Sequence, residues 1–70
     1  MMEYQILETL VRIPSDKSWH LELNLMKWGN NPPKYDLRSW NDDHSKMGKG
    51  ATLTKEELQL LKDELSKIEL

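Results

Sequence analysis

The sequence contains no cysteine and two histidines among its 70 residues. Disulfides and thiolate metal sites are therefore excluded. His20 and His44 have no partner at a spacing typical of zinc sites, so we predict no structural metal. A chain this short buries only about 60% of the surface that its unfolded form exposes. Because disulfides and metals are excluded as supplements to so small a core, we predict a homodimer.

Long hydrophobic runs are also missing. No apolar stretch approaches the roughly 20 residues that span a bilayer, so no membrane partner is expected. Residues 1–13 carry Glu3, Glu8 and Arg12, which is unlike the apolar core of a signal peptide. Together with the absent cysteine, this predicts a cytoplasmic protein. No repeat, low-complexity segment or internal boundary divides the sequence, and we expect a single domain over residues 1–70.

Neither sign of charge dominates, because 10 Lys and Arg face 12 Asp and Glu for a formal net charge of -2. Bulk charge is therefore not that of a nucleic-acid binder, although whole-chain charge is a weak guide. The distribution is more informative: the acidic excess lies in residues 55–70. Residues 27–54 instead carry five basic side chains and three acidic ones: Lys27, Lys34, Arg38, Lys46 and Lys49 against Asp36, Asp42 and Asp43. An anionic partner is expected to bind this middle segment.

Catalytic motifs are absent as well. The sequence has no Gly-rich phosphate loop, no Gly-x-Ser-x-Gly elbow, no His-Glu-x-x-His pair and no cysteine nucleophile. Asp42, Asp43 and His44 combine acids with a histidine, but as neighbours in a polar segment they are more typical of a solvated loop tip. A chain of this length also supplies too few residues to line a substrate pocket of ordinary size. We predict a non-enzymatic protein with no cofactor, no metal and no small-molecule substrate.

Alternation of apolar and polar residues predicts the strands. In residues 19–28, Trp19 and the leucines occupy one phase, and the other phase holds His20, Glu22, Asn24, Met26 and Trp28. This pattern is typical of a half-buried antiparallel strand with the leucines inward and the other phase in solvent. Residues 3–13 pair with it as a hairpin through the turn residues 14–17. Residues 34–40 continue the alternation, with Tyr35 and Leu37 inward, and residues 51–53 form a short fourth strand.

A capping box predicts the start of a C-terminal helix, since Thr54 is followed three residues later by Glu57. The helix carries an apolar stripe at helical spacing, which we assign to the core or to a dimer interface: Leu58, Leu61, Leu65 and Ile68. The predicted fold is α+β, a four-stranded antiparallel curved sheet followed by one amphipathic helix. The helix is expected to cover one face of the sheet and to leave the other open.

The open face gathers aromatic and basic side chains: Asn24, Met26, Trp28, Arg38 and Trp40. Such a face can stack unpaired bases on its rings while its cations follow the phosphates. Alternatively, Trp28 and Trp40 cover one another, and Arg38 pairs with Glu22 or Asp36. Lys49, flanked by Gly48 and Gly50, can approach a phosphate or can lie in a solvated turn.

The residues from Lys34 to Trp40, the segment Met47 to Thr54 and the acidic, leucine-rich helix resemble the transcriptional positive cofactor 4 family, in particular its small bacterial YdbC-type members. The resemblance covers residues 19–69. It implies a homodimer whose curved sheets bind single-stranded DNA with little sequence preference, and whose helices and the strands beside them form the dimer interface. It also implies that Arg38 and Lys49 match DNA-contacting residues, that Trp40 lies near a base-stacking aromatic, and that Trp28 replaces an exposed aromatic.

We therefore predict a sequence-tolerant binder of single-stranded DNA, active in transcription or DNA maintenance. Its site is expected to comprise Trp28, Arg38, Trp40 and Lys49, with peripheral contributions from Met26, Asn24, Lys34, His20, Lys46 and Lys17. Two alternatives remain open. The same face can bind a protein of the transcription machinery, with the tryptophans as anchors, or it can bind RNA, because stacking does not distinguish ribose from deoxyribose.

Overall fold

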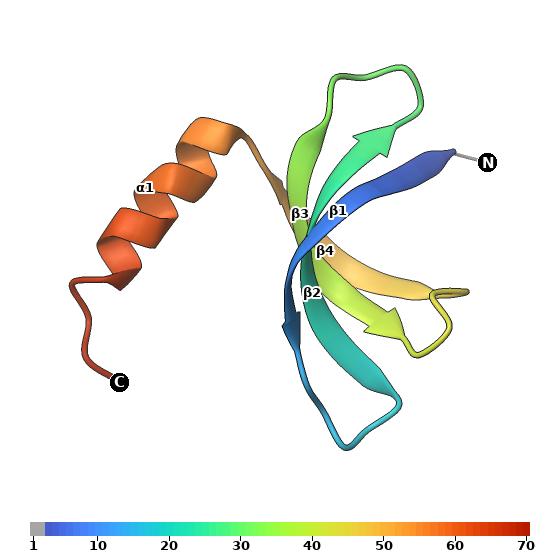
Figure 1. Cartoon of the computed structure of the whole chain (residues 1–70), viewed down its shortest axis with the longest axis horizontal. Helices are drawn as coiled ribbons and strands as arrows, with labels where there is room; N and C mark the ends of the chain where they lie inside the picture. Colours follow the sequence, from blue (N-terminus) through green and yellow to red (C-terminus); the bar gives the residue numbers. More distant parts are fainter. Residues whose placement is uncertain (1–2) are drawn as a thin grey trace.

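Four strands and one helix make up the computed structural model, which describes residues 3–70. The elements are β1 (Tyr4–Ile13), β2 (Trp19–Trp28), β3 (Lys34–Asn41), β4 (Met47–Leu53) and α1 (Lys55–Leu65) (Figure 1). The strands form one antiparallel sheet in the order β1-β2-β3-β4. The α+β class, the four antiparallel strands and the C-terminal helix are thus confirmed. No helix within residues 3–70 is long and apolar enough to cross a membrane.

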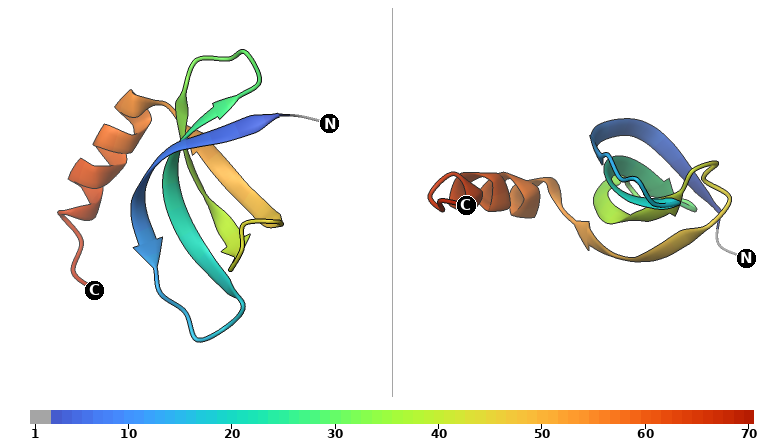
Figure 2. Two further views of the ribbon diagram at one scale, coloured as in Figure 1. Left: turned by 45° about the vertical axis from the view of Figure 1, so that its right-hand side comes forward. Right: turned by 90° about the horizontal axis from the view of Figure 1, so that it is seen from below.

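The sheet is strongly curled because its edge strands carry irregularities. The register of β1 against β2 shifts twice, between Ile6 and Glu8 and between Thr9 and Val11. Such bulges bend a strand and increase its twist. Tyr4 faces Trp28 at one end of β2, and Trp40 faces His20 at the other end, about 26 Å away in a straight strand. In the curled sheet (Figure 2), the Tyr4 ring nevertheless lies 5.7 Å from both the Trp28 and the Trp40 rings.

The curl reverses the predicted burial of the two faces. The concave face, expected in solvent, holds the buried side chains of the described residues: His20, Glu22, Asn24, Met26, Asp36 and Trp40. The convex face, expected inward, leaves Leu21 40% and Leu37 36% exposed. Alternation correctly identified which residues share a face. The assignment of inside and outside was wrong, because the face with the aromatic rings closes on itself.

The helix begins as predicted but does not cover the sheet. The capping box is formed: the Thr54 backbone N–H donates to Glu57 Oε1 at 2.8 Å, and the Glu57 N–H donates to Thr54 Oγ1 at 3.1 Å. None of the residues Lys55–Leu65 is buried, and α1 projects away from the sheet (Figures 1 and 2). The prediction that the helix covers one sheet face is therefore wrong for the single chain.

An apolar groove of about 530 Å³ separates the helix from the convex face. Its walls are almost entirely leucine and valine side chains from both sides: Leu10, Val11, Leu23, Leu37, Leu53, Leu58, Leu61 and Leu65, with Lys62 at one edge. The stripe predicted as core or dimer interface therefore lies beside this groove. It remains at least partly in solvent, and Ile68, beyond the end of α1, is exposed too.

The fourth strand is longer than predicted and begins at Met47, because the glycines allow close pairing with β3. Gly50 lies opposite Arg38. A Cβ atom on Gly50 would lie 2.3 Å from the Cβ of Arg38 and 2.5 Å from the Leu37 carbonyl oxygen. No side chain fits at that separation, so Gly50 sets how closely β4 approaches the Arg38 position.

We expect Gly50→Ala to lower the free energy of unfolding by about 1–3 kcal/mol, because β3 and β4 must separate to admit the methyl group. Urea denaturation of both proteins measures the difference. Gly48→Ala is the matched control, since its Cβ would meet Ser39 Cβ at an ordinary 3.5 Å. Equal effects of the two substitutions would contradict the close approach at Gly50.

Candidate nucleic-acid interface

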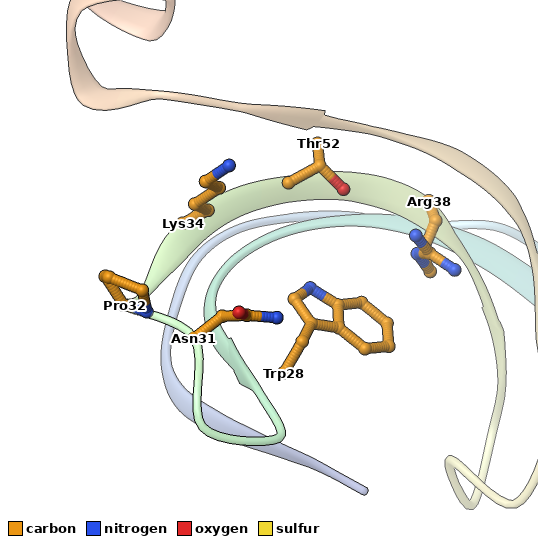
Figure 3. A pocket seen from close by; sticks show the side chains of 6 residues that line it. All are labelled: Trp28, Asn31, Pro32, Lys34, Arg38 and Thr52. Carbon is orange, nitrogen blue, oxygen red and sulfur yellow. The ribbon is translucent and has the colours of Figure 1, made fainter. Parts of the chain in front are cut away.

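A hollow of about 570 Å³ opens where β2 ends, and it contains the exposed part of Trp28. Its lining comes from β2, β3, β4 and the turn between β2 and β3: Trp28, Asn31, Pro32, Lys34, Arg38 and Thr52. Figure 3 shows these side chains arranged around the indole of Trp28. The hollow therefore combines an aromatic ring, two cations and two small polar side chains.

The turn after β2 positions one side of this hollow. Gly29 adopts a left-handed conformation with φ of 54°, which glycine accommodates without steric strain. The Asn31 N–H donates to the Trp28 carbonyl oxygen at 3.0 Å, and the Gly29 N–H donates to the Glu3 carbonyl oxygen at 2.7 Å. These bonds and the rigid Pro32-Pro33 pair place Asn31 and Pro32 beside the Trp28 ring.

Arg38 is held in place by a fully buried carboxylate. Its Nε donates to Asp36 Oδ1 at 2.5 Å and its Nη2 donates to Asp36 Oδ2 at 2.7 Å, while Thr52 Oγ1 donates to the same Oδ2 at 3.3 Å. The Arg38 guanidinium carbon lies 5.0 Å from the centre of the Trp28 ring, within range of a cation–π interaction. The predicted alternative of pairing with Asp36 is thus what the structure shows. Arg38 serves as a fixed support for the indole.

Trp40 does not line the hollow. Its side chain is fully buried, and its ring packs against Tyr4 and, at 5.2 Å between centroids, against His44. In this conformation it offers no free face to a base. The alternative in which Trp28 and Trp40 cover one another is not what the structure shows. Instead, both tryptophan rings pack against the Tyr4 ring, which lies between them.

The other predicted site residues lie in three places. Lys34 lines the hollow beside Trp28 and Arg38. His20, Asn24 and Met26 are buried on the concave face and form its floor. The remaining cations are exposed around the sheet, in the turn before β2, in the β3–β4 loop and on β4, and do not line the hollow: Lys17, Lys46 and Lys49.

Sequence reasoning missed Tyr4, Asn31, Pro32 and Thr52. Thr52 pairs in register with Asp36 and was within reach of prediction, because a fourth strand extended to Met47 places it on the face of Arg38. Asn31 and Pro32 give only a turn signal, which says nothing about what lies beside the turn. The contact of Tyr4 with Trp40 depends on the curl of the whole sheet, for which the sequence carries no short-range pattern.

A second polar cluster lies at the opposite end of the concave face. Glu22 accepts hydrogen bonds from Nε2 of His20, from Asn24 Nδ2 at 3.1 Å and from His44 Nε2 at 2.9 Å. Burial alone would raise the pKa of the Glu22 carboxyl, but these hydrogen bonds and the charge of His44 hold the pKa below its ordinary value. The absence of a partner at a spacing typical of zinc sites holds along the sequence, but the fold brings the two histidines together. They meet on one carboxylate across the sheet.

Comparison with known proteins identifies a family for most of the chain. The family described as Transcriptional Coactivator p15 (PC4) matches residues 15–64, which include β2, β3, β4 and most of α1. An uncharacterized protein of Treponema pallidum (strain Nichols) is 48% identical over 56 residues, which is 80% of this chain and 66% of that protein. The chain thus spans just under two thirds of this relative's length. Because the family match covers most of the chain and all the cationic and aromatic residues of the hollow, this protein belongs to the Transcriptional Coactivator p15 (PC4) family.

Proposed function

We propose that this chain is a non-enzymatic domain that binds single-stranded DNA as a homodimer, with one base stacked on Trp28 in each protomer. The half-buried indole of Trp28, fixed by Arg38 and flanked by Lys34, carries the proposal. Membership of a family of transcriptional coactivators supports a nucleic-acid partner and a role in transcription. The proposal treats residues 1–70 as one functional domain.

The chemistry of the hollow favours a base over other ligands. Arg38 lies over the Trp28 ring, and the part of the indole that lines the hollow is available for stacking, which is worth roughly 1–3 kcal/mol per base and tolerates any sequence. The Trp28 Nε1 and Asn24 Oδ1 atoms have no hydrogen-bond partner within residues 3–70. Because Trp28 Nε1 is buried, we assign base contact to the part of the indole ring that lines the hollow.

Exposed cations are available for phosphate contacts at the rim of the hollow and elsewhere on the sheet. Lys34 stands at that rim, and we assign phosphate contacts also to Lys17, Lys46 and Lys49. Arg38 contributes mainly by orienting Trp28, because its charge is shared with Asp36. The buried residues of the concave face set its shape and are not expected to contact the DNA strand directly: Asn24, Met26, His20 and Trp40.

A tryptophan fluorescence titration tests this proposal, using a roughly 20-nucleotide oligo-dT beside the matched duplex. We expect the single strand to quench the emission and the duplex to compete poorly. With three to five phosphates neutralised per protomer, log affinity should fall with log salt with a slope of about 0.7 per phosphate. Competition with oligo-U measures the preference for DNA over RNA. Absence of binding at low salt contradicts the proposal, and salt-insensitive binding to a protein partner would favour the alternative of a protein-interaction module.

The homodimer is supported by the open shape of the single chain. Its accessible surface is 5732 Å², whereas a folded monomer of 8.3 kDa is expected to expose about 4,600 Å². Its radius of gyration of 13.0 Å also exceeds the roughly 11 Å expected for this length. Leucines of the convex face and the helix are among the large apolar side chains that this chain exposes. A second copy that fills the groove beside α1 would bury them.

We expect Leu61→Glu to convert the dimer into a monomer, because it places a charge in the apolar groove that the partner fills. Sedimentation equilibrium measures the mass. Leu60→Glu is the control, since Leu60 is 63% exposed and lies outside this groove. A wild-type protein that sediments as a monomer at high concentration would refute the homodimer.

A further inference from the structure

Two imidazoles and a carboxylate converge at one end of the concave face. His20 and Glu22 are alternate residues of β2 and point to the same side of the sheet, where both are buried. His44 approaches from the β3–β4 loop, where it adopts a left-handed conformation with φ of 61° and its N–H donates to the Asn41 carbonyl oxygen at 3.1 Å. This turn folds the imidazole back over β2.

The donor atoms are close enough to share one ion. Nε2 of His44 lies 2.9 and 3.1 Å from the two Glu22 carboxylate oxygens, and Nε2 of His20 contacts one of the same oxygens. One ligand atom from each of the three residues falls within 4.8 Å of the others. Tetrahedral zinc, with bonds of about 2.0–2.1 Å, requires donors about 3.3 Å apart. Side-chain adjustments of around an ångström would therefore suffice.

We propose that His20, Glu22 and His44 form a binding site for one divalent transition-metal ion, for which Zn²⁺ is the best chemical match. Two neutral imidazoles and one carboxylate are a donor set that zinc sites use, with solvent in the fourth position. The half-exposed His44 leaves an entry path from the loop side. Calcium and magnesium are disfavoured, because they take oxygen ligands in greater number.

The surroundings of the cluster support this assignment over a simple hydrogen-bonded network. Metal-bound histidines commonly donate the other ring N–H to a carboxylate. Nδ1 of His20 has no hydrogen-bond partner within the described residues and lies 3.9 Å from Asp42 Oδ1. Metal binding at Nε2 places the ring proton on Nδ1, facing Asp42. Asn24 Nδ2 already donates a hydrogen bond to Glu22 Oε1 at 3.1 Å. It thereby orients the Glu22 carboxylate, as a supporting group around a metal ligand does.

A bound ion would fasten the β3–β4 loop to β2. Through its contact with Glu22, His44 Nε2 connects this loop to strand β2. The same loop carries Lys46, one of the exposed cations. The site uses residues at the other end of β2 from Trp28, and metal binding can be measured without nucleic acid. Its effect should appear first in the stability of the chain.

The test uses tag-free protein stripped with EDTA and titrated with ZnCl₂ by calorimetry. We expect one Zn²⁺ per chain with a Kd of micromolar or tighter. At 100 times the Kd, the melting temperature should rise by at least about 5 °C. Substitution of Co²⁺ for Zn²⁺ should give visible absorption typical of a four-coordinate site. A Kd weaker than about 1 mM overturns the proposal.

Two variants and one wild-type measurement separate the metal site from other effects. His44→Asn keeps a residue that tolerates the left-handed conformation but removes the imidazole, and it should weaken Zn²⁺ binding by at least 100-fold. Asp43→Asn changes an exposed acid on the same loop and should leave the affinity unchanged. In the wild type, Zn²⁺ should shift the Nε2 resonances of both histidines. Equal affinities of His44→Asn and wild type, or unshifted Nε2 resonances, overturn the assignment.

Discussion

Replacing Arg38 with alanine is expected to lower the free energy of unfolding by about 3–5 kcal/mol, because it leaves the buried Asp36 carboxylate without its ion-pair partner. Asp36 is fully buried and receives two hydrogen bonds from the guanidinium. After the substitution, the hydrogen bond from Thr52 at 3.3 Å remains on this carboxylate. Since small domains are stable by only about 5–15 kcal/mol, the variant should lose much of its stability. Urea denaturation followed by circular dichroism measures the loss.

Two further proteins show that the effect comes from the pair. Lys34→Ala removes an exposed cation from the same hollow and should change stability by less than about 0.5 kcal/mol. Asp36→Asn combined with Arg38→Ala should recover part of the loss, since the uncompensated charge is gone. If Arg38→Ala proves as mild as Lys34→Ala, the ion pair does not support this part of the sheet. Stability is measured rather than DNA binding, because Arg38→Ala can lose binding either through misfolding or through a lost contact with DNA.

Replacing Trp28 with alanine is expected to weaken binding of oligo-dT by about 5- to 150-fold. The substitution removes the stacking surface, which is worth roughly 1–3 kcal/mol per base, and each 1.4 kcal/mol is a factor of ten. Fluorescence anisotropy of an end-labelled oligonucleotide measures the affinity. Trp28→Phe should restore part of it, because a smaller aromatic face remains available.

Trp19→Ala is the matched control for this substitution. Trp19 lies on the other phase of the same strand and is 40% exposed on the convex face. Its removal should leave the affinity for oligo-dT within about twofold of the wild type, which is under 0.5 kcal/mol. Loss of affinity in Trp19→Ala with retention in Trp28→Ala would move the binding site to the convex face.

Short-range patterns predicted the elements of this fold well, and their limit lies in the curvature of the sheet. A period of two identifies the residues that share a face, such as Glu22 and Asn24, but does not say whether that face closes on itself. Closure depends on the bulges of β1 near Leu7 and Leu10, and nothing in that apolar run marks an extra residue. The leucine phase was therefore assigned to the inside, where a flat sheet would have placed it.

In the candidate site, too, short-range patterns predicted some residues, whereas the positions of others depend on the tertiary fold. Trp28, Lys34 and Arg38 were predicted from alternation, composition and family resemblance, and the structure brings all three to one hollow. Trp40 was predicted beside them, but its ring lies in the floor instead. The pairing of His44 with Glu22 joins residues 22 positions apart. It depends on the conformation of the β3–β4 loop, which the sequence indicates only as polar and irregular.

The most direct test of the central claim is a ¹H–¹⁵N spectrum of the three tryptophan indoles during titration with oligo-dT. The sequence holds three tryptophans, and their N–H resonances report separately on the hollow, the buried floor and the convex face. We predict that the Trp28 resonance shifts most, that of Trp40 less, and that of Trp19 not at all. Saturating binding that leaves the Trp28 indole unmoved, or that shifts Trp19 instead, would contradict the assignment of the hollow as the base-binding site.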